Sequence, residues 1–104
     1  MTLKPLSNLS AASLRDGAFE ALGYEIMAEK AASLGRAGAR VEASLARLDQ
    51  AGSAAADRAA LLRDAADAVY AYFIQRELAG FRRHDEVIRI YRIPRAVLAR
   101  LGAR

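Results

Sequence analysis

Few side chains in this sequence could do acid–base or metal chemistry. His84 is the only histidine and cysteine is absent, so a metal site made of nitrogen and sulfur ligands is not available. Two carboxylate pairs, Glu25/Glu29 and Asp64/Asp67, have the spacing of single helix faces. A di-iron helix bundle, however, needs Glu-x-x-His, and a phenylalanine stands three residues before the histidine. The sequence therefore predicts no metal site and no cofactor.

The sequence also lacks the residue patterns that nucleophilic catalysis needs. Six serines are present, but none stands beside the histidine or in the glycine elbow of a hydrolase. The glycines at 35 and 38 lack the lysine and the preceding strand of a phosphate-binding loop. We therefore expect no catalytic residues and no enzyme activity. His84 is assigned a structural role, in which it caps or orients a helix that starts at Asp85.

The C-terminal segment is strongly basic. Residues 81–104 hold seven arginines against two carboxylates, a charge of +5, whereas residues 1–80 carry −1 and the whole chain +4. Such a cluster can mark a surface that binds nucleic acid or an acidic partner. Arginines on short helices more often lie in solvent and pair with acidic side chains nearby. The candidate contacts are Arg82, Arg83, Arg89, Arg92, Arg95 and Arg100.

Part of this segment is similar to DNA-binding helix-turn-helix units, which often place Ile-Pro ahead of the recognition helix. Ile93 and Pro94 are followed here by Arg95 and by further apolar and basic residues. The sequence departs from the pattern at two positions, because Arg92 stands where a left-handed turn usually has glycine and Ile88 where alanine is usual. We therefore prefer an ordinary pair of short packing helices and keep DNA binding as the alternative.

Size and composition predict one small helical domain. The 104 residues include 25 alanines, which favour helix but bury little area each, so the core should be thin. A second copy often completes such a core, and we expect a homo-oligomer, most simply a dimer. No stretch has the length of a signal peptide's apolar region or of a membrane span, which predicts a cytoplasmic protein without a membrane partner.

An apolar stripe with spacings of three and four predicts one long helix over residues 13–51. Ser13 and Asp16 resemble a capping pair at its start, and residues 1–12 are expected to form a loose N-terminal segment. Gly35 and Gly38 either permit close packing or mark a kink. The stripe consists of Tyr24, Met27, Ala31, Leu34, Gly38, Val41, Leu45 and Leu48.

The dipeptide Gly52-Ser53 can end this helix and begin another, so we expect a tight turn and an antiparallel helix over 54–79. Facing residues then have numbers that sum to about 106, which places Leu34 opposite Tyr72 and an aromatic ring over Gly35. The inner face of this second helix should consist of Leu61, Leu62, Ala65, Ala68, Val69, Tyr72, Phe73 and Ala79.

Beyond Gly80 the periodic pieces are shorter. They predict two short helices over 85–91 and 94–101, the first with Val87, Ile90 and Tyr91 facing inward. The expected fold class is all-α: a long antiparallel helix hairpin plus two short C-terminal helices in a single domain over 13–104. A homo-oligomer would complete the helical bundle.

Three apolar side chains have no cover from the hairpin itself. The second helix ends opposite Met27, which leaves Phe19, Leu22 and Ile26 beyond its reach. Exposing them would sacrifice on the order of 2 kcal/mol each. We therefore predict that they form an interface, either with the C-terminal segment of the same chain or with a partner subunit.

Several phrases of the sequence resemble a family of small bacterial helical proteins that is uncharacterised. The similarity covers residues 24–102 and leaves residues 10–23 outside it. It implies a compact all-α domain and assigns no activity, cofactor or site residue. The phrases are AEKAASLGRAGARVEASL, YAYFIQRE and YRIPRAVLARLG.

Three functions are compatible with these observations. The preferred one is a structural or interaction module that self-associates and presents a face to a protein partner. The second is a DNA-associated regulator that uses the basic segment. The third is a small-ligand-binding helical protein, whose pocket would lie between the second helix and the C-terminal helices and would be lined by Tyr72, Phe73, Arg76 and Tyr91.

Overall fold

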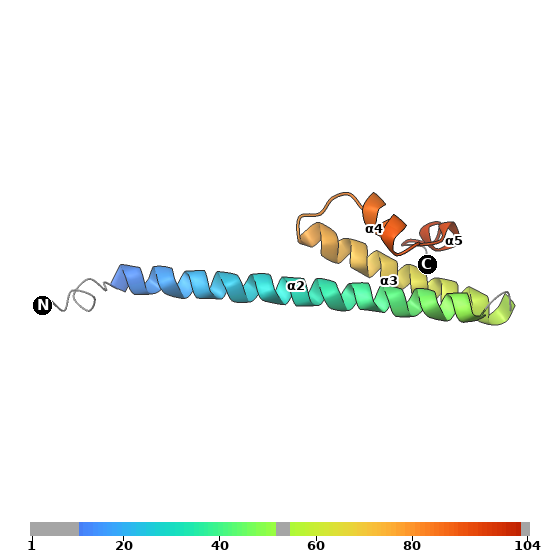
Figure 1. Cartoon of the computed structure of the whole chain (residues 1–104), viewed down its shortest axis with the longest axis horizontal. Helices are drawn as coiled ribbons and strands as arrows, with labels where there is room; N and C mark the ends of the chain where they lie inside the picture. Colours follow the sequence, from blue (N-terminus) through green and yellow to red (C-terminus); the bar gives the residue numbers. More distant parts are fainter. Residues whose placement is uncertain (1–10, 52–54, 103–104) are drawn as a thin grey trace, which may run out of the picture. The chain divides into compact units, whose positions relative to one another are not determined.

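The structure, a computed structural model, describes residues 11–51 and 55–102. It consists of α2 (Ala11–Ala51), α3 (Ala55–Leu78), α4 (Asp85–Ile90) and α5 (Arg95–Leu98), and the described residues include no strand (Figure 1). The predicted all-α fold class is therefore confirmed, whereas the oligomeric part of that prediction stays a prediction. The chain divides into two units at Ala31, and the two are described separately.

Helix α2 is continuous from Ala11 to Ala51. It begins two residues before the predicted start, so Ser13 is its third residue, and the predicted capping role of Ser13 and Asp16 is wrong. Alanine is the strongest helix former, which explains why Ala11 and Ala12 extend the helix. The helix also runs through Gly35 and Gly38 without a break. The predicted turn at 52–53 and residues 1–10 lie outside the described residues.

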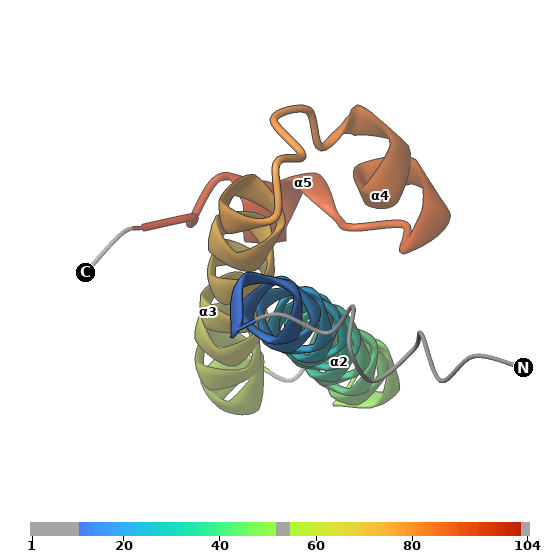
Figure 2. The same ribbon diagram turned by 90° about the vertical axis from the view of Figure 1, so that its left-hand side faces the viewer.

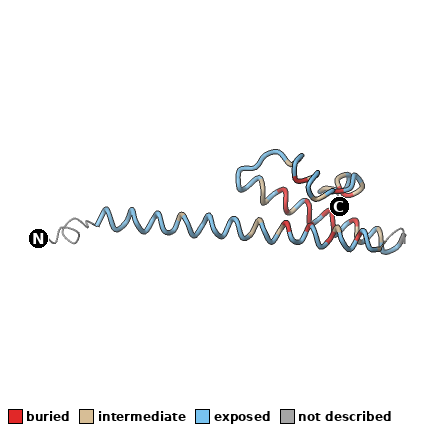
Figure 3. The backbone as a smooth tube through the Cα atoms, viewed as in Figure 1, coloured by how far each residue is buried: buried red, intermediate tan, exposed pale blue. Residues whose placement is uncertain are grey.

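The first unit contributes the part of α2 between residues 11 and 31. Apart from the half-buried Gly23, every residue in this range is exposed, as the pale blue tube shows (Figure 3). Tyr24, Met27 and Ala31 were predicted to belong to the buried stripe, and the structure corrects this, because the buried part of the stripe begins only at Leu34.

The core of the second unit forms where α3 lies beside the second half of α2 (Figures 1 and 2). Val41 and Leu48 of α2 are buried there. The residues of α3 that were predicted to face inward are buried or half-buried, with the exception of Ala79, which is exposed. Ala66 is also buried, although it was not predicted to be. Small side chains dominate this core. It is made of Val41, Leu48, Leu62, Ala65, Ala66, Ala68, Val69, Tyr72, Phe73, Val87, Ile93 and Val97.

The pairing of α2 with α3 differs from the predicted register at Tyr72. A Cβ built on Gly38 would lie 3.6 Å from Cε1 of Tyr72, whereas one built on Gly35 would meet nothing within 4 Å. The predicted contact of an aromatic ring with Gly35 is therefore wrong. Side chains on a helix lean toward its N-terminus. The ring of Tyr72 accordingly extends along α2 toward higher residue numbers and reaches Gly38.

The C-terminal helices close the core over α3. Helix α5 packs against α3, and Val87, Ile93 and Val97 are buried. Ile90 was predicted to face inward, but it is 61% exposed. Around the axis of α4, the inward side is instead centred on the C-cap residue Tyr91, which lies between Val87 and Ile88. Successive helical residues are about 100° apart, so Ile90 falls on the far side of Val87 from this face.

The helix ends differ slightly from those predicted. Helix α3 ends at Leu78, where Gly80 has a positive φ of 100°. The amide of Gly80 donates to the Glu77 carbonyl at 3.0 Å, and the amide of Phe81 donates to the Arg76 carbonyl at 2.9 Å. These two bonds define a Schellman cap, and glycine takes the left-handed position without strain. Helix α5 stops at Leu98 rather than at 101, and the following residues form turns.

Candidate functional site

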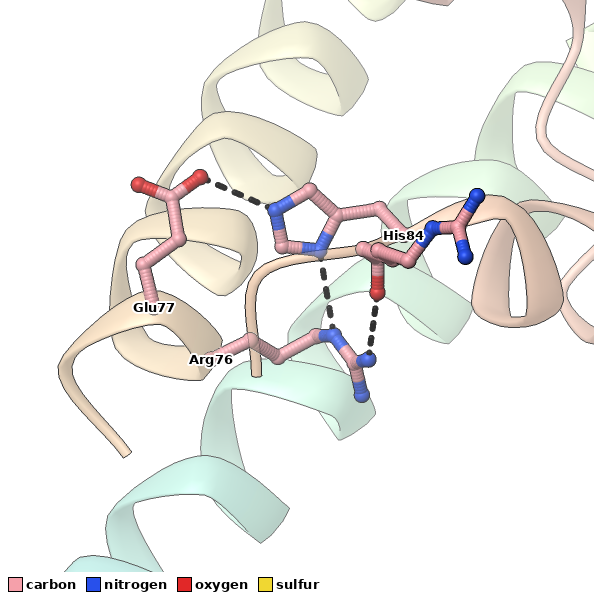
Figure 4. A network of polar contacts seen from close by, with 4 residues as sticks. Arg76, Glu77 and His84 are labelled. Carbon is pink, nitrogen blue, oxygen red and sulfur yellow. Dashed lines mark hydrogen bonds and ion pairs between the residues drawn. The ribbon is translucent and has the colours of Figure 1, made fainter. Parts of the chain in front are cut away.

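His84 joins the end of α3 to the start of α4. The Arg76 Nε–H donates to Nδ1 of His84 at 3.2 Å, and Nη2 of the same guanidinium donates to the Arg83 carbonyl at 3.0 Å (Figure 4). Because Nδ1 accepts a hydrogen bond, the neutral ring carries its proton on Nε2. That nitrogen lies 2.9 Å from Oε2 of Glu77 and donates to it. Both ring nitrogens are thus occupied by neighbours from α3.

Aromatic rings also contact His84 and Arg76. The His84 ring stacks on Phe73 with centroids 4.1 Å apart and planes 2° from parallel. The Arg76 guanidinium lies 4.9 Å from the centre of the Phe81 ring and 5.9 Å from that of Tyr72, which are cation–π distances. His84 is the N-cap residue of α4, but its side chain makes no capping bond. It therefore orients α4 by binding back to α3, which supports the structural role assigned to it.

Gly38 provides the close contact between α2 and the end of α4. A Cβ at this position would come within 2.8 Å of the Tyr91 hydroxyl, and the Tyr91 ring meets the Tyr72 ring edge-on with centroids 5.6 Å apart. Burial raises the pKa of Tyr91 above its usual value of 10.0, helped by the hydrogen bond with the Tyr72 side chain and by the charge of Glu42. The phenol is therefore held in its neutral form.

An open groove lies between α2 and the corner that joins α4 to α5. Leu45 and Leu48 supply apolar surface from α2, and the corner adds Ile90, Tyr91 and Pro94. Charged side chains complete the lining. The acidic ones come from α2 and the basic ones from α3 and the corner: they are Glu42, Asp49, Arg58 and Arg92, and Ala46 is the remaining lining residue.

This groove is not the pocket that the sequence predicted. Of the four residues predicted to line a pocket, Tyr91 lines the groove. Tyr72 and Phe73 are buried in the core, and Arg76 is engaged with His84 and Arg83. The spacing of Glu42, Leu45 and Asp49 marks one helix face in the sequence. The corner that carries Tyr91, Arg92 and Pro94 makes that face one wall of a groove.

The corner between α4 and α5 contains a residue in the left-handed conformation. The Arg92 amide donates to the Arg89 carbonyl at 3.2 Å, and the Ile93 amide donates to the Ile88 carbonyl at 3.0 Å. Arg92 itself has a positive φ of 53°. The pattern is a Schellman cap, in which the apolar residues at the ends of the longer bond pack together. Arg92 thus adopts the left-handed conformation without glycine, and Ile88 packs against the core beside the buried Ile93.

The six candidate arginines are all exposed but belong to different elements. Two precede α4, one lies on α4, one is at the corner, one begins α5 and one follows it. Arg92 is the member of the set that lines the groove. The Arg100 Nη1 donates to the Ala96 carbonyl at 3.3 Å, so part of its donor capacity is directed at the backbone of α5. Binding by any of the six stays a prediction.

The predicted interface residues form a solvent-facing stripe in the first unit. Phe19 is 70% exposed, Leu22 49% and Ile26 48%. Their spacing of three and four places them on one face of α2. The structure therefore leaves the stripe in solvent, and the prediction that a partner covers it stays a prediction.

Neither a metal cluster nor a membrane span is found in the described part of the chain. Among residues 11–51 and 55–102, no three His, Asp or Glu side chains are grouped so that they could hold a metal ion. No helix there combines the length and the apolar character needed to cross a bilayer.

The comparisons with known proteins point to one family. A family of unknown function (DUF6665) has a model that matches residues 1–104, and the chain belongs to this family. The predicted membership of an uncharacterised family is confirmed. Residues 10–23, which the predicted similarity left out, lie inside the match. No curated protein and no solved structure matches the chain.

Proposed function

We propose that this member of a family of unknown function is a non-catalytic interaction module that associates with a second copy of itself in the cytoplasm. The observation that carries the proposal is the exposed stripe of Phe19, Leu22 and Ile26, which lies in a stretch of α2 where the described residues other than Gly23 are all exposed. Burying such side chains contributes about 1.5–3 kcal/mol each. Their exposure is therefore a strong driving force for association.

The composition of the same helical stretch supports this function. Gly17 and Gly23 lie inside α2, and a Cβ at either position would meet nothing within 4 Å. Each glycine costs about 1 kcal/mol relative to alanine in a helix interior. A helix without packing contacts is marginal even when built from good helix formers. Gly23 follows Phe19 by four residues, so it lies on the same face of the helix, where the lack of a side chain would let a second helix approach closely.

Sedimentation equilibrium of matched variants tests the proposal. Leu22→Lys should shift the wild-type protein from a dimer or larger assembly to a monomer, because it places a charge in the stripe. Tyr24→Lys is the control: Tyr24 is 73% exposed, and it stands two residues from Leu22, on the opposite face of the helix. A wild-type protein that is monomeric at high micromolar concentration would overturn the proposal.

DNA association is the second candidate. The helix-turn-helix pattern usually has glycine in a left-handed turn where this chain has Arg92, and Arg92 adopts that left-handed conformation. The exposed Arg95 at the start of α5 would then face the nucleic acid. Titration of duplex DNA at several salt concentrations tests it. A genuine contact predicts affinity that falls steeply with salt and is lost in Arg95→Glu but kept in Arg40→Glu, an exposed arginine of α2. The absence of binding at low salt would remove this candidate.

A further inference from the structure

We propose that His84 is a pH-sensitive switch, whose neutral ring holds Arg76 against the residues that join α3 to α4 and whose protonated ring releases it. This inference concerns the conformation of the chain and is independent of the proposed self-association. It rests on the hydrogen bond from Nε of Arg76 to Nδ1 of His84, which are 3.2 Å apart (Figure 4). Imidazole is the side chain whose ordinary change of charge falls between about pH 5 and about pH 8.

The contact between Arg76 and His84 can exist only while the ring is neutral. A guanidinium has hydrogen-bond donors and no acceptor, and a protonated imidazole has a donor on each nitrogen. A second proton, on Nδ1, would therefore point an N–H group at the N–H of Arg76 across 3.2 Å. It would also place two positive charges side by side, and like charges repel. Protonation of the ring therefore breaks this contact.

The other contacts of the ring are compatible with both charge states. Nε2 carries a proton in each state, so it can donate to Oε2 of Glu77, 2.9 Å away, before and after the change. A carboxylate at this distance favours the charged ring, and so does the face of Phe73, on which the ring stacks. Asp85 and Glu86, in the first turn of α4, add negative charge next to it in the chain. The ring can therefore stay in place while Arg76 leaves.

Arg76 connects several parts of the linker through one rigid group. Its Nη2 donates to the Arg83 carbonyl at 3.0 Å, and its guanidinium carbon lies 4.9 Å from the centre of the Phe81 ring. A guanidinium is planar, so Nε and Nη2 move together. When Nε turns away from His84, Nη2 also leaves the Arg83 carbonyl. The linker between α3 and α4 thus loses its contacts with Arg76 in acid, whereas His84 remains bound to α3.

Nuclear magnetic resonance between about pH 8 and about pH 5 tests the proposal, and His84 is the only histidine whose ring signals need assignment. At the upper pH, the neutral ring should carry its proton on Nε2. As the ring takes up its second proton, the Nε–H of Arg76 should exchange with solvent about tenfold faster relative to that of the exposed Arg40. The carbonyl carbon signal of Arg83 should shift over the same pH range.

Two variants separate the parts of the switch. His84→Asn offers an amide oxygen near the position of Nδ1 and does not titrate in this range, so the relative exchange of the Arg76 Nε–H should no longer change with pH. Glu77→Gln removes the carboxylate that favours the charged ring, so the release of Arg76 should move to lower pH. Circular dichroism checks that both variants keep the helical content of the wild type.

Three results would overturn the proposal. The first is relative exchange of the Arg76 Nε–H that stays constant in the wild type while the ring of His84 titrates. The second is a neutral ring that carries its proton on Nδ1, because Arg76 could not then donate to that nitrogen. The third is a release of Arg76 that persists unchanged in His84→Asn, because it would place the titrating group elsewhere.

Discussion

At the scale of single residues, Gly38 explains how the C-terminal helices approach α2. The sequence predicted that Gly35 and Gly38 both lie near the packed stripe. It could not show which of the two contacts a neighbour, because glycine has no side chain whose pattern reveals one. The structure separates them: Gly38 lies under Tyr91 and Tyr72, and Gly35 faces open space. Close approach, rather than a turn, is the reason for glycine at position 38.

Alanine substitutions at the two glycines should therefore have opposite effects. Gly35→Ala should stabilise the fold by up to about 1 kcal/mol, because alanine is the better helix former. Gly38→Ala has the same gain in propensity, but its methyl group would lie 2.8 Å from the Tyr91 hydroxyl, and overpacking typically costs about 1–3 kcal/mol. Urea unfolding measures both variants. Equal stabilisation by the two substitutions would show that Tyr91 does not pack on Gly38.

The half-buried phenol of Tyr91 predicts a loss of stability in alkali. Its pKa is raised in the folded state, chiefly by burial, so the folded protein holds the proton more tightly than the unfolded chain. The contribution is fully present below the unfolded pKa of 10.0 and is lost as the pH rises through that value toward the folded one.

Urea unfolding between about pH 9 and about pH 11 checks this, because that range brackets an ordinary tyrosine pKa. The wild type should lose more stability over this range than Tyr91→Phe does. Tyr70→Phe, at an exposed tyrosine of α3, should follow the wild type. Parallel curves for the wild type and Tyr91→Phe would contradict the burial of this hydroxyl.

At the scale of elements, the periodicity of apolar residues was sufficient to predict four helices and their order. It did not predict the exact contacts between them, since the lean of side chains along a helix shifts which residues touch. Tyr72 reaches Gly38 for that reason. The left-handed conformation of Arg92 could not be predicted from its residue type, because residues with a side chain rarely adopt a positive φ.

The two Schellman caps make the left-handed positions testable. Arg92→Gly should stabilise the protein by up to about 1 kcal/mol, because glycine adopts a positive φ without the cost that a side chain carries. Gly80→Ala should destabilise it by a similar amount, since Gly80 has a φ of 100°. Thermal unfolding compares them. A loss of stability in Arg92→Gly would show that the arginine side chain, rather than the turn, matters at the corner.

At the scale of the whole molecule, two surfaces stand out among the described residues: the exposed stripe on the first part of α2 and the groove beside the corner. The stripe could be predicted from residue spacing alone, because the numbers of facing residues in the hairpin showed that the second helix ends opposite Met27. The groove could not be, because it depends on Tyr91, Gly38 and the turn at Arg92 acting together. The sequence therefore predicted the stripe and missed the groove.

Amide hydrogen exchange at increasing protein concentration tests self-association most directly. A helix with every side chain in solvent opens readily, so its amides exchange fast unless a partner covers it. We predict that amides between Leu14 and Met27 become protected as the concentration rises from low micromolar to near-millimolar, in step with the measured mass, and that Leu22→Lys abolishes this protection. Fast exchange that stays the same at every concentration would contradict the account.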